Sequence, residues 1–222
     1  VVEGYMDVVA LAQFGLGYAV AALGTSTTAE HIKLLFRQTD HVYFCFDGDA
    51  AGRKAAWRAL ENALPQLKDD KTLSFLFLPP EHDPDSFIRQ YGRQRFEEAL
   101  LHESKHLSHY FWETLTGGAE PNTQEAKAEL VKRAAPLLRQ ITQAPTLSYL
   151  LRQELSEKTG IDPNNLAQLM GQAAPQRHVA AKSYQLPRES YRQPAPATLL
   201  QQQLRTLLFN AEWAEYVSFP DY

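Results

Sequence analysis

The chain has 222 residues, of which 44% are hydrophobic and 22% are charged, and its formal net charge is −4. This composition is ordinary for a globular protein. No apolar stretch reaches the roughly 20 residues of a membrane span, and a single cysteine excludes an internal disulfide. The negative charge argues against non-specific duplex binding, which depends on Lys and Arg contacts to phosphate, but it does not exclude a nucleic-acid substrate. We expect a cytoplasmic protein without membrane contact.

The first hundred residues alternate between strand and helix patterns. Expected strands cover residues 1–3, 18–23, 41–46 and 73–78, and expected helices cover residues 7–14, 29–37, 50–64 and 85–91. Alternation of this kind is typical of βαβ units. It predicts an α/β fold in which helices flank a parallel sheet.

The remaining residues follow a different organisation. Residues 94–172 contain helix patterns only and predict a small helical bundle. Residues 173–197 hold four prolines and an excess of basic side chains, so we expect a flexible basic linker there. Residues 198–222 have a leucine-rich helical face, which we interpret as the start of a further domain. Because the chain opens on strand-like residues without a methionine, we read it as a fragment cut at both ends.

Three groups of carboxylates each follow an expected strand. Glu3 follows the first, Asp47 and Asp49 follow the third, and Asp83 and Asp85 follow the fourth. In an open α/β sheet, chemistry gathers outside the carboxyl ends of the strands. Oxygen ligands in this number suit Mg²⁺ or Mn²⁺. The sequence therefore predicts a divalent-metal site at this edge, of the kind used in phosphate chemistry.

A structural explanation competes with the metal site at the Asp-Gly-Asp segment. Asp49 precedes the expected helix 50–64 and is a good N-cap, so capping explains the pair equally well when it is taken alone. Gly48 allows a tight turn, and Gly52 lets the helix start lie close to a neighbour. The combination with Glu3 and with the later carboxylates favours metal binding.

Basic and histidine side chains give weaker signals. Arg53 and Lys54, in the first turn of the expected helix 50–64, are possible nucleotide or template contacts, but exposed basic residues are common and a solvated helix face is the favoured interpretation. His102, His106 and His109 have a spacing that permits a metal site on one helix face. A surface or packing role is favoured for all three histidines.

Four motifs together resemble the Toprim domain of bacterial replicative (DnaG-type) primases. They are Glu-Gly-Tyr-Met-Asp at 3–7, Ala-Leu-Gly-Thr at 22–25, Asp-Gly-Asp-Ala-Ala-Gly-Arg at 47–53 and Asp-Pro-Asp at 83–85. Topoisomerases and some nucleases share the Toprim fold, whose signature is a strand-end Glu plus Asp-x-Asp. The other motifs are more specific to primases. The resemblance implies a Toprim catalytic domain over residues 1–93.

The resemblance also implies a function. It is metal-dependent synthesis of short RNA primers on a single-stranded DNA template from ribonucleoside triphosphates. Glu3, Asp47 and Asp49 would be the catalytic metal ligands for Mg²⁺ or Mn²⁺, and Asp7, Asp83 and Asp85 would form a secondary acidic pocket. The family further implies contact with the replicative helicase through the C-terminal region, here residues 198–222.

The chain departs from the family pattern in two respects. It has no Cys/His cluster to match the family's zinc-binding domain, so zinc is expected only outside this chain, and it lacks the basic subdomain that precedes the Toprim strand. We therefore expect the isolated chain to bind metal but to make primers poorly. Two alternatives remain: another Toprim enzyme, a nuclease or topoisomerase-like protein, or a replisome scaffold with an inert acidic cluster.

Overall fold

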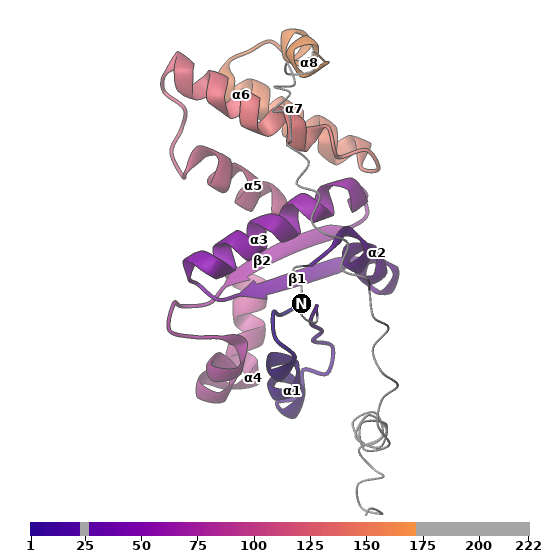
Figure 1. Ribbon diagram of the computed structural model, residues 1–222, viewed down its shortest axis with the longest axis vertical. Coiled ribbons are helices and arrows are strands. Elements are labelled where there is room, and N and C mark those ends of the chain that lie inside the picture. The colour runs from indigo at the N-terminus through magenta and orange to yellow at the C-terminus, as the bar shows by residue number, and fades with distance from the viewer. Residues whose placement is uncertain (23–26, 172–222) are drawn as a thin grey trace, which may run out of the picture. The chain divides into compact units, whose positions relative to one another are not determined.

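A sheet of three strands organises the first half of the computed structural model, which describes residues 1–22 and 27–171 (Figure 1). Strand β1 (His41–Phe46) pairs in parallel with β2 (Thr72–Phe77), with Phe46 opposite Phe77. Strand β3 (Lys105–His106) pairs antiparallel with β2. Because β1 and β2 end at the same level, the residues that follow them lie at one edge of the sheet.

The first residues of the chain lie beside β1. The N–H of Cys45 donates to the carbonyl oxygen of Val1 at 2.8 Å, and the N–H of Val2 donates to that of Val20 at 2.9 Å. Val2 and Ala21 form a parallel bridge. The expected strands 1–3 and 18–23 are thus reduced to this short contact, and Glu3 follows it at the edge where β1 ends.

Helices cover the two faces of the sheet (Figure 1). Helix α3 (Ala50–Ala63), which continues into a 3-10 turn (Leu64–Gln66), lies on one face with α2 (Ala29–Gln38) and α5 (Leu107–Thr116). Helices α1 (Tyr5–Gln13) and α4 (Pro84–His102) pack together against the other. The expected α/β architecture with flanking helices is confirmed.

Side chains of β1 alternate between two hydrophobic cores, one on each face of the sheet. Successive strand residues point to opposite faces, so Phe44 and Phe46 join the core under α3 while Cys45 joins the core under α1 and α4. Burial raises the pKa of the Cys45 thiol to about 12. This cysteine is a small buried hydrophobe, as expected for a thiol inside a strand.

The second half of the described chain is helical. After α5 come α6 (Gln124–Leu138), α7 (Pro145–Thr159) and α8 (Pro163–Gly171). Their buried side chains belong to the same core as the α3 face of the sheet. The carboxylate of Asp69 also accepts hydrogen bonds from the backbone N–H groups of Thr146 (3.1 Å) and Leu147 (3.0 Å) at the start of α7. The described residues belong to one compact unit, and the expected boundary at residue 93 directly follows Gly92, where the backbone of α4 is non-helical.

The structure departs from the expectations at β3 and at the three histidines. Strand β3 was not expected, and it makes the sheet mixed because β3 runs antiparallel to β2. The expected end of helix 85–91 is confirmed, because Gly92, at φ 79°, is non-helical and kinks α4 there. His102, His106 and His109 lie in α4, β3 and α5, so the expected shared helix face is wrong.

Some expectations fall outside the described part of the chain. These are the linker 173–197 and the helix within 198–222. Within residues 1–22 and 27–171, no helix combines the length and apolar character needed to cross a membrane.

Candidate functional site

The carboxyl edge of the sheet gathers the carboxylates that the sequence singled out. Asp47 directly follows β1, and Glu3 directly follows the segment paired with β1. Burial raises the pKa of Glu3, and the negative charges of Asp47, Asp49 and Asp7 raise it further. Side chains from distant parts of the sequence therefore interact electrostatically at this edge.

Two glycines let the Asp47–Asp49 turn pack tightly. A Cβ atom on Gly48 would overlap the carbonyl oxygen of Leu78, just past the end of β2. A Cβ on Gly52 would overlap the carbonyl oxygen of Asp47. Neither glycine has a positive φ. Close approach of the backbone therefore requires glycine here.

Asp49 also caps a helix. Its Oδ1 accepts a hydrogen bond of 2.7 Å from the N–H of Gly52, which satisfies one of the free donors at the start of α3. The capping interpretation of Asp49 is thus correct, and it fixes the side chain in place. A carboxylate has two oxygens, so capping by Oδ1 is compatible with a ligand role for Oδ2.

Asp47 lies at the centre of the acidic edge. Burial raises its pKa, as do the charges of Asp7, Asp83 and Asp49, in that order. The pKa of Asp7 is also raised, mainly by burial and further by the negative charges of Asp83 and Asp85. A hydrogen bond from the Gly4 N–H partly offsets this rise, because it stabilises the charged carboxylate. The charges acting on Glu3, Asp7 and Asp47 are all negative, so the three repel one another at neutral pH.

The secondary carboxylates are each engaged in a local contact. Asp7 Oδ2 accepts from the N–H of Gly4 at 3.0 Å, and Asp83 Oδ1 accepts from the N–H of Ser86 at 2.7 Å, which caps α4. Hydrogen bonds from Ser86 lower the pKa of Asp83.

Asp85 forms an ion pair with Arg89 one turn later in α4. Its negative charge still contributes to the raised pKa of Asp7. Asp85 thus belongs to the acidic edge while being partly neutralised by its own helix.

The acidic edge has the donor chemistry of a magnesium site but not its closed geometry. In the part of the chain that the structure describes, no three His, Cys, Asp or Glu side chains stand close enough to hold a metal ion. The donors are nonetheless partly buried anionic oxygens, the ligands that Mg²⁺ takes together with several waters. Their repulsion is what a cation would relieve, so the residues fit such an ion.

Arg53 and Lys54 occupy the first turn of α3. The guanidinium carbon of Arg53 lies 5.1 Å from the ring centroid of Phe77 at the end of β2, in cation–π geometry. Its backbone carbonyl accepts a hydrogen bond of 3.1 Å from the Tyr110 hydroxyl. Both residues are exposed, and the Arg53 guanidinium lies near the end of β2.

His82 supports the acidic edge and was not identified from the sequence. It is buried next to Asp83, with Nδ1 3.3 Å from the Ser86 hydroxyl. Its ring packs edge-on against Phe87 and Tyr91, at 5.8 and 5.4 Å. A lone histidine beside an aspartate carries no distinctive pattern, so only the packing reveals this supporting role.

Comparison with known families gives two matches along the chain. Residues 1–88 match the Toprim-like family, and residues 108–164 match the DnaB-helicase binding domain of primase. The second match covers α5 to the start of α8. The helicase contact expected at 198–222 lies outside the described residues.

Several curated relatives are DNA primases. The one from Neisseria meningitidis serogroup A is 70% identical over 222 residues, which is all of this chain and 38% of the relative. The one from Escherichia coli K12 is 51% identical over 175 residues, covering 78% of this chain and 30% of the relative. The chain thus spans well under half the length of these relatives.

Solved structures agree with the sequence relatives. A DNA primase domain from Pseudomonas aeruginosa has a TM-score of 0.74 and 52% identity, over 77% of this chain and 53% of that one. A DnaG primase catalytic domain bound to single-stranded DNA has a TM-score of 0.69 and 49% identity, over 74% of this chain and 52% of that one.

Proposed function

The chain belongs to the family of DnaG-type DNA primases, and on that premise we propose that its acidic sheet edge is a nucleotidyl-transfer centre. The reaction joins the 3′-hydroxyl of a growing RNA to the α-phosphate of a ribonucleoside triphosphate and releases pyrophosphate. The observation that carries the proposal is the position of Glu3, Asp47 and Asp49 at the edge where β1 ends, and their mutual charge raises the pKa of Glu3.

Glu3, Asp47 and Asp49 are the residues that would hold Mg²⁺ or Mn²⁺. When bound, such ions neutralise phosphate charge and align the attacking and leaving oxygens. The helix cap made by Asp49 and the tight turn that Gly48 and Gly52 allow hold the carboxylate ligands in place before substrate binds.

The secondary residues extend the site. Asp7, Asp83 and Asp85 add negative charge beside Asp47 and suit further ligands, directly or through water. Arg53 and Lys54, on the first turn of α3, suit contact with the triphosphate or the template. The support for Arg53 is its position over Phe77 at the end of β2.

The proposed activity also implies which molecules the protein binds. They are a single-stranded DNA template, ribonucleoside triphosphates and the replicative helicase, in the bacterial cytoplasm. A related catalytic domain with bound single-stranded DNA supports the template, and the family match over residues 108–164 supports the helicase. We propose residues 1–93 as the Toprim catalytic domain and the helices that follow, within 94–172, as a helical subdomain.

An exchange experiment tests the activity. The 222-residue segment replaces its counterpart in the Neisseria primase, which is 70% identical, and primer synthesis is measured on a single-stranded template. The exchanged enzyme is expected to make primers, and Asp47→Asn within it to lose at least about 100-fold in rate, because metal-held charge stabilisation is worth several kcal/mol.

Asp70→Asn is the matched control, since Asp70 is exposed and lies in the turn before β2. It should leave the rate unchanged. We expect the isolated chain to make primers poorly. Equal rates for Asp47→Asn and Asp70→Asn would contradict the proposal, and cleavage of duplex DNA without polymer growth would favour a Toprim nuclease.

A further inference from the structure

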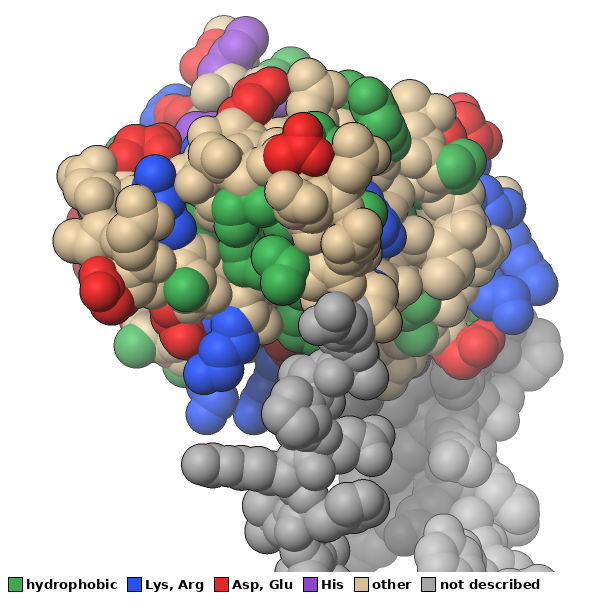
Figure 2. Space-filling model, turned by 90° about the horizontal axis from the view of Figure 1, so that it is seen from above, with side chains coloured by type: hydrophobic (Ala, Val, Ile, Leu, Met, Phe, Trp, Pro, Cys, Tyr) green, Lys and Arg blue, Asp and Glu red, His purple; other side chains and the backbone are tan. Residues whose placement is uncertain are grey.

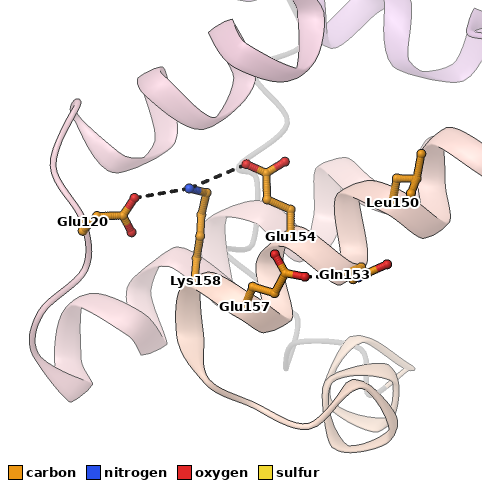
Figure 3. A pocket seen from close by; sticks show the side chains of 6 residues that line it. All are labelled: Glu120, Leu150, Gln153, Glu154, Glu157 and Lys158. Atoms are coloured by element: carbon orange, nitrogen blue, oxygen red, sulfur yellow. Dashed lines mark hydrogen bonds and ion pairs between the residues drawn. The ribbon is translucent and has the colours of Figure 1, made fainter.

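A groove runs along α7 in the helical part of the molecule, away from the acidic sheet edge. Its volume is about 570 Å³, and Figure 3 shows the side chains that line it: Glu120, Leu150, Gln153, Glu154, Glu157 and Lys158. An adjoining cavity of about 540 Å³ shares Glu120, Glu154 and Lys158 with it. The groove lies within the segment that matches the helicase-binding family.

The groove carries an excess of negative charge. Lys158 is its single basic residue, and that side chain is only 19% exposed. Its Nζ pairs with Glu120 at 3.4 Å and with Glu154 at 3.6 Å (Figure 3). Glu157 accepts a hydrogen bond from Gln153 on the same helix at 3.1 Å and faces no basic partner in the groove. The groove therefore holds three glutamates and one lysine, and that lysine is already paired with two of the glutamates.

Apolar surface lies beside these charges. Leu150 lines the groove and is 53% exposed, and its neighbour Tyr149 is 67% exposed. Figure 2, which views the molecule from the end where α6, α7 and α8 lie, shows hydrophobic side chains among polar ones on this face. In the adjoining cavity, the buried Nε1 of Trp112 has no hydrogen-bond partner among the described residues.

We propose that this groove binds a basic amphipathic segment of the replicative helicase. Lysine or arginine side chains of that segment would pair with Glu154 and Glu157, and an apolar side chain would cover Leu150. The inference rests on the proposed function, since it names the surface through which the helicase is contacted. Charge complementarity selects a basic segment, because an acidic one would be repelled by the surplus glutamates.

Binding of the labelled 222-residue chain to the replicative helicase, followed by fluorescence anisotropy, tests the groove. The double variant E154K/E157K is expected to weaken binding by at least about tenfold, because like charges would then face each other. Leu150→Asp should weaken it as well. The matched control is E30K/E98K, which makes the same change in net charge at exposed sites in α2 and α4, outside residues 108–164. It should bind as the unmodified chain does.

The outcomes separate the two levels of the proposal. If the unmodified chain does not bind the helicase, the partner named under the proposed function is wrong. If the unmodified chain binds and E154K/E157K binds equally well, the groove assignment alone is wrong. Loss of binding on changing Leu204 and Leu207 to Asp, with no effect of E154K/E157K, would also overturn the groove and move the contact to residues 198–222. Circular dichroism of each variant verifies that the helices are retained.

Discussion

Replacing Asp47 by Asn is expected to stabilise the metal-free chain and to remove its binding of divalent ions. The pKa values of Glu3, Asp7 and Asp47 are raised by burial and by mutual repulsion. A carboxyl whose pKa is higher in the folded state than in the unfolded state, where it is about 4, stabilises the folded protein when it is protonated. This stabilisation is complete below about pH 4 and is lost as the pH rises through the pKa of the folded state. At neutral pH the charged cluster therefore opposes folding, and the neutral amide at position 47 relieves part of that repulsion.

Thermal unfolding in EDTA and in Mn²⁺ measures both effects. In EDTA at pH 7.5, Asp47→Asn should raise the midpoint by about 1–4 °C, and the difference from the unmodified chain should shrink toward pH 4. Mn²⁺ at about 100 times its Kd should raise the midpoint of the unmodified chain by roughly 5–10 °C and that of the variant far less. Asp70→Asn serves as control. A destabilised variant that keeps the full Mn²⁺ response would contradict the electrostatic account.

Replacing Gly48 by Ala is expected to be the most destabilising small change in the site. The added methyl group would overlap the carbonyl oxygen of Leu78, which is backbone and has little freedom to move. Overpacking against a rigid neighbour costs about 3 kcal/mol, which corresponds to roughly 6–12 °C in the midpoint of a domain of this size. Urea denaturation with a linear extrapolation gives the free energy of unfolding directly.

Gly17→Ala is the matched control for this substitution. Gly17 has ordinary backbone geometry and no atom within 4 Å of its ideal Cβ position. Alanine there should be neutral, or stabilising by about 0.4–1 kcal/mol through the unfolded state. If the two variants unfold alike, the close approach of the Asp47–Asp49 turn to the end of β2 is not present in solution.

The elements that the sequence predicted well are those with a strong local pattern. β1 has the expected bounds, 41–46, because a continuous apolar run between turn residues is typical of a buried strand. α3 begins at Ala50 as expected, because Asp49 caps it. Since these two elements fix the position of Asp47 and Asp49, the acidic edge was predictable from local signals and one rule about parallel sheets.

The features that were not predicted depend on contacts distant in sequence. β3 has only two residues, which is too short to show the alternating hydrophobic pattern of a strand. It forms because its residues pair with Ser74 and Phe75 of β2. The burial of His82 has a different origin, because Phe87 and Tyr91 lie nearby in sequence and reach its ring only through the way α4 packs. Sequence places carboxylates at an edge but does not give the sub-ångström positions that distinguish a closed ligand cage from a looser cluster.

The choice among Toprim enzymes rests on more than the acidic edge. Nucleases and topoisomerases share Glu plus Asp-x-Asp, so those residues alone do not discriminate between reactions. The match over residues 108–164 and the 70% identity that extends over the whole chain are specific to primases. The whole chain therefore decides the family, and the sheet edge carries the chemistry that we propose.

Crystals of the chain soaked in Mn²⁺, with data collected at the manganese absorption edge, test the central claim most directly. We expect an anomalous peak within about 2–2.5 Å of oxygens from Glu3 and Asp47, with Asp49 contributing directly or through water. Soaked Asp47→Asn crystals should lack that peak. Manganese bound elsewhere while this edge holds none, or a Glu3 carboxylate turned away from Asp47, would contradict the account.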